Sequence, residues 1–491
     1  MQKLSQVRTR IDKNYYYIKC LEKLIPFQKN DPDKVKLITL IGRIYAGCVT
    51  GVYSSDVLEA ELVRIGKDIP FRPAGGPVKG RTLHVMTQGF AIGGHPVIVS
   101  NWIRWDKDAR SSIAFTDMPA AKVPDFLKES VRESGGELFC INRRKDDISK
   151  AKELLEISAP YERVILHTHM YDTVPVLAYS NPDWNCPVYL YNHADFRFSF
   201  GFSVADRVLN MCPYDVKKTI SYRGIQPGNS VWMQFPGNGQ LLESEKVCEK
   251  ENARKTVETL YGMEKDAKLI VSMGADFKYE SIIGYDFGMF VRNVLEAYEG
   301  TAYFYVIGAD RAKENWKKLE ADTKGRARAL GYLPREKAEE LIAAADLYVV
   351  SFPMKASGAT TAELYHVPYV SLHLLGRGIE NYGVSAARTI PELTEKALEV
   401  LRGNGEKYCG HIVGNTWSEA KWLRVWKTVR ERENGHRIQK FSPHRFVKRQ
   451  EYINCQLMQD QINGRDQYEA VFTSGYTGSI IQGLSKIWGM E

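Results

Sequence analysis

The residue pattern that carries the most chemistry lies between residues 352 and 370, where the sequence reads FPMKASGATTAELYHVPYV. It follows an apolar run typical of a strand, so its small residues should form the first turn of a helix: Ser357, Gly358, Ala359, Thr360 and Thr361. Unpaired backbone N–H groups at a helix start bind phosphate well. Glu363 lies one turn further, where its carboxylate can accept hydrogen bonds from both hydroxyls of a ribose. The pattern predicts a nucleotide site, with a capped helix and a solvated glutamate as the alternative.

A lysine follows a second apolar run in the same half of the chain. The segment VSMGADFK ends at Lys278, with Gly274 between the apolar run and the lysine. An ammonium group is a compact positive charge that suits a diphosphate. We therefore expect Lys278 near the predicted nucleotide site, and the alternative is an ordinary surface lysine.

A glycine-rich turn lies near the start of the other half, in the segment TQGFAIGGH. Gly93 and Gly94 remove side chains at the point where a strand passes into a helix, and His95 follows them. This turn can admit a phosphate or a sugar hydroxyl to the helix start. Glycine-rich turns of this kind also occur for purely structural reasons.

Histidine and aspartate follow an apolar strand candidate in the segment YNHAD. His193 stands at the strand end, and Asp195 follows two residues later. A histidine with a pKa near neutrality can take a proton from an acceptor hydroxyl, so we predict that His193 is a general base. The alternative is a buried histidine that is hydrogen-bonded to the aspartate.

A competing interpretation uses the segment HTHMYD. His167, His169 and Asp172, joined by His193 and Asp195, would suffice for a divalent metal. The runner-up function is therefore a metal-dependent hydrolase. It leaves the pattern around Glu363 without a role.

These motifs need a scaffold of strands that end at one edge of a sheet. From Arg81 onward, short apolar runs alternate with amphipathic stretches, and this alternation is typical of a parallel sheet covered by helices on both faces. The expected strands of the first series are 83–86, 113–115, 137–141 and 163–166, and the helices are 94–105, 123–134 and 148–157. The second series has strands at 269–272, 303–307, 347–350 and 369–372, and helices at 286–298, 335–345 and 359–365.

Composition limits the classes of protein to consider. The net charge of +8 is spread over 491 residues, and we find no nucleic-acid-binding module. The eight cysteines form no CxxC motif, and no apolar stretch approaches the roughly 20 residues of a membrane span. We therefore expect a cytoplasmic protein that does not bind nucleic acid and has no transmembrane segment.

Taken together, the motifs of residues 81–374 resemble the GT-B glycosyltransferases, especially the group 1 and O-GlcNAc-transferase-like branches. The similarity rests on the order of four segments, which are VIG at 306–308, GYLP at 331–334, ADL at 345–347 and SGATTAE at 357–363. It implies a fold of two Rossmann-like α/β domains facing a cleft. It also implies that Gly331, Tyr332 and Leu333 hold the nucleotide base, and that Gly93 and Gly94 line the cleft from the acceptor side. Lys355 replaces a glutamate common in retaining enzymes, so an inverting reaction is at least as well supported.

The predicted domains are a helical N-terminal extension (1–78), an acceptor domain (79–235), a donor domain (236–415) and a helical tail that packs back on the body (416–491). We predict metal-independent transfer of a sugar from a nucleotide donor, a UDP-sugar in the first instance. The acceptor is a glycan, a lipid-linked sugar, a small molecule or a protein. No cofactor is expected. The N-terminal helices offer a surface for oligomerisation, and a binding protein without catalysis is a further alternative.

Overall fold

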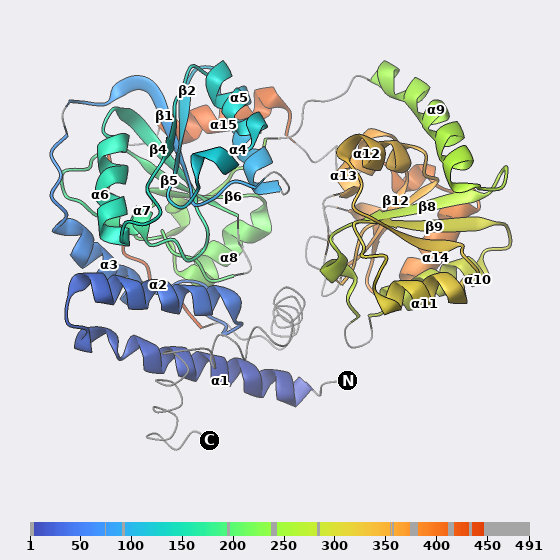
Figure 1. Cartoon of the computed structure of the whole chain (residues 1–491), viewed down its shortest axis with the longest axis horizontal. Helices are drawn as coiled ribbons and strands as arrows, with labels where there is room; N and C mark the ends of the chain where they lie inside the picture. Colours follow the sequence, from blue (N-terminus) through green and yellow to red (C-terminus); the bar gives the residue numbers. More distant parts are fainter. Residues whose placement is uncertain are drawn as a thin grey trace. The chain divides into compact units, whose positions relative to one another are not determined.

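The computed structural model describes residues 4–73, 75–90, 94–193, 197–236, 243–281, 285–353, 355, 358–373, 382–410, 417–431 and 435–445. Two compact units account for these residues (Figure 1). The N-terminal unit takes in residues 5–236 and also 417–431 and 435–445, and the C-terminal unit takes in residues 243–410.

The N-terminal unit is built on a seven-stranded parallel sheet with the order β3-β2-β1-β4-β5-β6-β7. The strands are β1 (Val78–Met86), β2 (Arg110–Phe115), β3 (Leu138–Cys140), β4 (Tyr161–His167), β5 (Val188–Asn192), β6 (Arg207–Asn210) and β7 (Ser230–Trp232). The helices are α1 (Leu4–Glu22), α2 (Asp31–Gly47), α3 (Asp56–Lys67), α4 (Gly94–Trp105), α5 (Asp125–Glu133), α6 (Asp147–Ser158), α7 (Val174–Tyr179), α8 (Pro213–Arg223) and α15 (Glu419–Glu431).

Alternate side chains of this sheet enter two different cores, as the twofold repeat of a strand requires. In β1, Leu83 and Val85 pack in a core with α2, α3, α6 and α7, whereas Met86 packs on the opposite face with α4 and α5. The N-terminal helices α2 and α3 therefore complete the core of the first sheet. Continuous burial on both faces explains why the central strands read as unbroken apolar runs.

Helix α15 comes from the far end of the sequence and closes the same face as α4. Its Trp422 and Trp426 are fully buried against Trp102 of α4. The indole N–H of Trp426 donates to the buried carboxylate of Asp106 at 2.7 Å, which removes the cost of burying an unpaired donor.

The C-terminal unit has a six-stranded parallel sheet with the order β10-β9-β8-β11-β12-β13. Its strands are β8 (Lys268–Met273), β9 (Ala302–Ile307), β10 (Ala327–Gly331), β11 (Leu347–Val349), β12 (Tyr369–Leu372) and β13 (Ala386–Ala387). Its helices are α9 (Glu243–Tyr261), α10 (Phe287–Ala297), α11 (Glu314–Asp322), α12 (Arg335–Ala343), α13 (Gly358–Leu364) and α14 (Ile390–Leu401), with a 3-10 turn η4 at Asp276–Tyr279.

Helices again cover both faces of the second sheet. One core joins the sheet to α10, α11 and α14, and another joins it to α9, α12 and α13. The prediction of two doubly wound parallel sheets is confirmed. Among the described residues, the helices are too short or too polar to cross a bilayer.

Candidate functional site

Both sheets have a point at which successive strands are added in opposite directions. In the C-terminal unit this switch lies between β8 and β11, and in the N-terminal unit it lies between β1 and β4. Loops on either side of such a switch diverge and leave room for a ligand at the carboxyl ends of the strands. Most of the predicted site residues follow these strands, whereas His193 follows β5 and the segment 331–333 begins at the end of β10. We describe each unit by itself.

Backbone hydrogen bonds join the loops at the carboxyl edge of the C-terminal sheet. The N–H of Gly274, after β8, donates to the carbonyl of Ile307 at 3.0 Å, and the N–H of Gly308, after β9, donates to Gly331 at 2.7 Å. Gly308 has a φ of 84°, a left-handed conformation in which other residues are strained. A side chain there would also collide with the carbonyl of Gly274. The glycines thus let three loops pack as one platform.

Lys278 lies in the turn η4, within the loop that follows β8 and forms part of this platform. Its ammonium donates a hydrogen bond to the carbonyl oxygen of Lys355 at 3.0 Å, across a sequence separation of 77 residues. Lys355 lies in the loop that leads into α13. The contact joins Lys278 to the loop that precedes the SGATTAE segment. Burial lowers the pKa of Lys278 because the charged form loses hydration.

Helix α13 is held tightly against β11 at its first residue. A β-carbon on Gly358 would overlap the hydroxyl of Tyr348. Ala359 packs in the core, while Thr360 and Thr361 are half-buried. Ser357 lies outside the described residues.

Glu363 is 4% exposed, so the alternative of a solvated glutamate in α13 is wrong. Its neighbour is Tyr382, whose pKa is raised to about 12 by burial and then by the charge of Glu363. The carboxylate of Glu363 is therefore withdrawn from bulk water within the C-terminal unit.

The sequence analysis did not identify a second cation, Lys355, at the carboxyl edge of the C-terminal sheet. The ammonium of Lys355 lies 2.6 Å from Nδ1 and 2.9 Å from Nε2 of His373, and 4.7 Å from the ring centroid of Tyr382. His373 directly follows β12. Lys355 was noted only as a departure from a family pattern, and its pairing with a residue 18 positions later depends on the β11–β12 register.

The segment Gly331–Leu333 follows β10 on the same edge. Gly331 has a φ of 72°, and its carbonyl accepts the hydrogen bond from Gly308. Tyr332 is 71% exposed, whereas Leu333 is half-buried against the core. The turn therefore presents an aromatic ring to solvent beside the platform.

In the N-terminal unit, histidines gather at the switch between β1 and β4. Nδ1 of His84 lies 3.1 Å from Nε2 of His167, and Nδ1 of His167 lies 3.0 Å from Nε2 of His193. The three rings form a hydrogen-bonded chain from the interior of β1, through the end of β4, to the residue after β5. Sequence reasoning missed His84, although a histidine between Leu83 and Val85 in an apolar run was a usable signal.

His95 completes this cluster from the start of α4. Its ring centroid lies 4.1 Å from that of His193 and 6.1 Å from that of His169. Burial lowers the pKa of His84 to about 3 and that of His95 to about 4. The pKa values of His167 and His193 also fall well below the usual range, chiefly by burial. The cluster is therefore neutral at pH 7.

The glycines and the aspartate predicted beside these histidines are only partly described. A β-carbon on Gly94 would meet nothing within 4 Å, so packing does not demand a glycine there. Gly93 and Asp195 lie outside the described residues.

Asp172 has a structural environment rather than a metal-binding one. Its carboxylate accepts hydrogen bonds from the hydroxyls of Thr87 and Thr116, both at 2.6 Å, and from the N–H of Val174 at 3.1 Å. These contacts tie the ends of β1 and β2 to the start of α7. The grouping of His167, His169 and Asp172 is therefore corrected: within the described residues, the set with metal-ligand spacing is His95, His167 and His193.

A hollow of about 560 Å³ lies beside the ends of β2 and β3 in the same unit. Arg143 and Arg144 line it together with Asp117, which accepts hydrogen bonds from Gln88 and Arg143. Gln88 belongs to the turn between β1 and α4. The hollow therefore adjoins the loop that leads to the histidines.

The sequence has no match among protein-family models and no significant match among curated proteins. Solved structures do resemble it. A glycosyltransferase from Rickettsia africae matches with a TM-score of 0.53 at 12% identity, over 72% of this chain and 98% of that one. An O-GlcNAc transferase from Thermobaculum terrenum matches with a TM-score of 0.48 at 14% identity, over 84% and 80%.

A UDP-GlcNAc 2-epimerase from Neisseria meningitidis, bound to UDP-GlcNAc, also matches, with a TM-score of 0.46 at 11% identity over 72% of this chain and all of that one. Likeness at such identities concerns the fold. Together with the two doubly wound sheets, it shows that the chain has the GT-B glycosyltransferase fold, as predicted.

Proposed function

We propose that this protein is a glycosyltransferase that takes a sugar from a nucleotide donor, a UDP-sugar in the first instance. The observation that carries the proposal is the contact between Lys278 and the loop before α13, the helix that buries Glu363. Residues 77 positions apart in sequence thus meet at the switch point of a parallel sheet. A cation and a carboxylate there match the diphosphate and the ribose of one ligand.

The leaving diphosphate is the charge that this site must stabilise. Lys278 supplies a partly buried ammonium, which interacts more strongly with a developing charge than a fully exposed one does. Lys355 supplies a second ammonium, held by His373. The amides of Gly358, Ala359 and Thr360, together with Ser357, would add hydrogen bonds. These groups do the work that a metal ion performs in other transferases, so no metal is required.

Other residues of the C-terminal unit would bind the nucleoside part of the donor. Glu363 would accept hydrogen bonds from the ribose hydroxyls. The turn Gly331–Leu333 would hold the base, with the exposed ring of Tyr332 available to stack on it.

The acceptor is assigned to the N-terminal unit, beside Gly93, Gly94 and His95. His193 would take the proton of the acceptor hydroxyl in an inverting transfer. Since Nε2 of His193 is engaged with His167, the base atom is Nδ1, and the proton must then lie on Nε2. Burial keeps His193 neutral but also makes it a weak base, so its contribution belongs near the lower end of the usual range of about 10²–10⁴-fold.

The test is a turnover assay with UDP-, GDP- and dTDP-sugars, with and without EDTA. We expect slow release of the nucleoside diphosphate from one donor class, undiminished by EDTA. His193→Ala should lower acceptor-dependent turnover by about 10²-fold and leave nucleotide affinity unchanged. Complete and metal-reversible inactivation by EDTA would instead support a metallohydrolase.

The melting temperature of the His193→Ala variant serves as the control that this variant is folded. If that variant stays folded, binds nucleotide and keeps full turnover, His193 is not the base. If no nucleotide sugar is turned over and no nucleoside diphosphate binds, the chain is not a nucleotide-sugar enzyme.

A further inference from the structure

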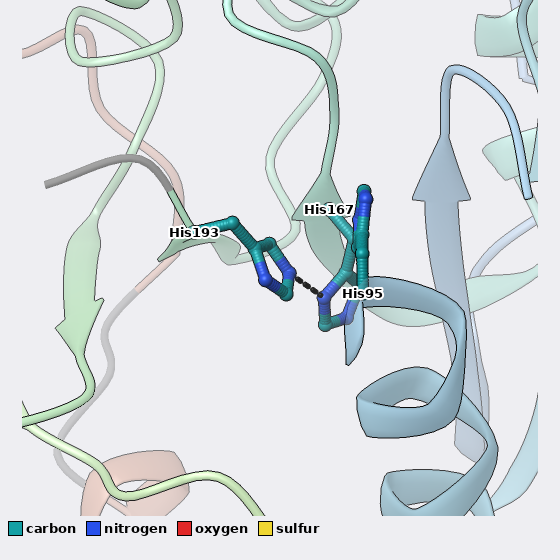
Figure 2. Close-up of side chains that lie close together, drawn as sticks. All are labelled: His95, His167 and His193. Carbon is teal, nitrogen blue, oxygen red and sulfur yellow. Dashed lines mark hydrogen bonds between the residues drawn. The ribbon is translucent and has the colours of Figure 1, made fainter. Parts of the chain in front are cut away.

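Three imidazole rings converge at the switch point of the N-terminal sheet in a way that base catalysis does not require. His95 comes from the start of α4, His167 from the end of β4 and His193 from the residue after β5 (Figure 2). One ring nitrogen from each lies within 4.8 Å of the other two. Three separate elements thus deliver the same kind of ligand atom to one point.

Hydrogen bonds to groups other than the three imidazole rings orient two of these rings as metal ligands are commonly oriented. Nε2 of His167 pairs with Nδ1 of His84, which leaves Nδ1 of His167 on the side of His193. The backbone of His167 hydrogen-bonds the ring of His95. Nε2 of His95 is buried and, among the described residues, has no hydrogen-bond partner. A buried nitrogen without a partner is costly unless something binds it.

We propose that His95, His167 and His193 bind a divalent transition metal, with Zn²⁺ as the best fit. Zinc takes three histidines plus one exchangeable ligand in tetrahedral geometry, with Zn–N bonds near 2.0–2.1 Å and so nitrogens about 3.3 Å apart. The 3.0 Å between the facing nitrogens of His167 and His193 needs little adjustment. The positive end of α4 lies at His95, so the fourth ligand should be an anion such as hydroxide.

Metal binding would oppose the proposed transfer reaction. A metal on Nε2 of His193 fixes the proton on Nδ1, and a protonated nitrogen cannot act as a base. This consequence rests on the proposed function, whereas the binding of metal does not. We therefore expect Zn²⁺ to inhibit acceptor-dependent turnover and EDTA to restore it.

The test is a titration of the EDTA-treated, dialysed full chain with Co²⁺, followed by displacement with Zn²⁺. We expect one Co²⁺ per chain with the visible absorption of a four-coordinate ion, and loss of that absorption when Zn²⁺ is added. His95→Ala should weaken Co²⁺ binding by at least 100-fold. The matched control is His169→Ala, which removes a nearby ring outside the trio and should keep the wild-type affinity.

A second variant controls for the possibility that His95→Ala loses metal because it misfolds. His95→Gln keeps a polar side chain and should fold, as judged by its melting temperature, while still losing Co²⁺. The proposal is overturned if wild-type protein binds no Co²⁺, or if His95→Gln binds it as tightly as wild type does. The melting shift with UDP in EDTA is measured on the same samples, so failure of the metal site and failure of nucleotide binding are told apart.

Discussion

Replacing Lys278 by methionine should separate the stability of the C-terminal unit from its affinity for nucleotide. The two side chains have similar length, so the apolar stem is retained while the charge is removed. In the free protein the ammonium is partly buried, with a hydrogen bond to the Lys355 carbonyl, and this burial lowers its pKa. The charge is therefore a cost in the absence of ligand. We expect the free energy of unfolding of Lys278→Met to equal that of wild type or to exceed it by about 1 kcal/mol.

Binding should change in the opposite direction. A hydrogen bond to a charged group contributes about 1.5–3 kcal/mol, so UDP should bind about 10–150-fold more weakly to Lys278→Met. Turnover should fall as well, because the contact strengthens as the diphosphate leaves. Urea unfolding gives the stability, and calorimetric titration with UDP gives the affinity.

The matched control is Lys317→Met, which removes an exposed lysine on α11 of the same unit. It should leave both quantities unchanged. Wild-type affinity for UDP in a folded Lys278→Met variant would refute the assignment of the diphosphate to this loop. A loss of several kcal/mol in stability would show instead that the lysine is a structural residue.

Three further predictions concern the same two sites. Glu363→Ala should weaken UDP binding by about 1–3 kcal/mol and abolish the preference for UDP over 2′-deoxy-UDP. Calorimetric titration measures both affinities, and a preference that persists in the variant would contradict the ribose contact. Gly358→Ala should destabilise the chain by about 1–3 kcal/mol in urea unfolding, because its β-carbon meets the Tyr348 hydroxyl, and adding Tyr348→Phe should recover most of the loss. Acid should destabilise the fold below about pH 6.5, because burial lowers the folded-state pKa values of His84 and His95 to about 3 and about 4, so the unfolded chain binds protons that the folded chain does not. For each of these two histidines the loss approaches about 1.4 kcal/mol per pH unit down to about pH 4. The pKa values of His167 and His193 are lowered as well, so these histidines change stability in the same direction. The folded-state pKa of Glu59 is raised to about 7, so below that pH the folded chain binds about one proton that the unfolded chain does not, and this offsets the effect of about one histidine. Urea unfolding at pH 7.5, 6.5 and 5.5 measures the net change in the free energy of unfolding.

The fold could be predicted largely because both sheets are buried on both faces. Buried parallel strands read as short apolar runs, so β12 was expected at its observed bounds, 369–372, and α4 at 94–105. The predicted strands of the first series do not include residues 230–232, yet these residues form β7, the edge strand of the first sheet. A run of three residues is too short to reveal its pairing with β6, which only the completed sheet provides.

The candidate sites show the same division between local and long-range information. Lys278 and Glu363 were found because each follows a recognisable strand. The partners Lys355 and His373 were not paired, and His84 was not noticed, because their contacts depend on the registers of β11 with β12 and β1 with β4. Asp172 was misread because threonines from two other strands satisfy its carboxylate. The type of a residue suggests the chemistry that it can perform, whereas the pairing of strands determines which other residues it contacts.

Thermal melting of the full chain in EDTA with increasing UDP, GDP or dTDP tests most directly whether nucleotide binds beside Lys278. We expect UDP to raise the melting temperature without metal, by several degrees at 100 times its Kd, since that excess stabilises the folded state by about 2.7 kcal/mol. Over the same concentration range we expect the shift of Lys278→Met to be about half that of wild type or less, because UDP should bind this variant about 10–150-fold more weakly. If none of the three nucleotides shifts the melt at millimolar concentration, or if Lys278→Met responds as wild type does, nucleotide does not bind beside Lys278 and α13.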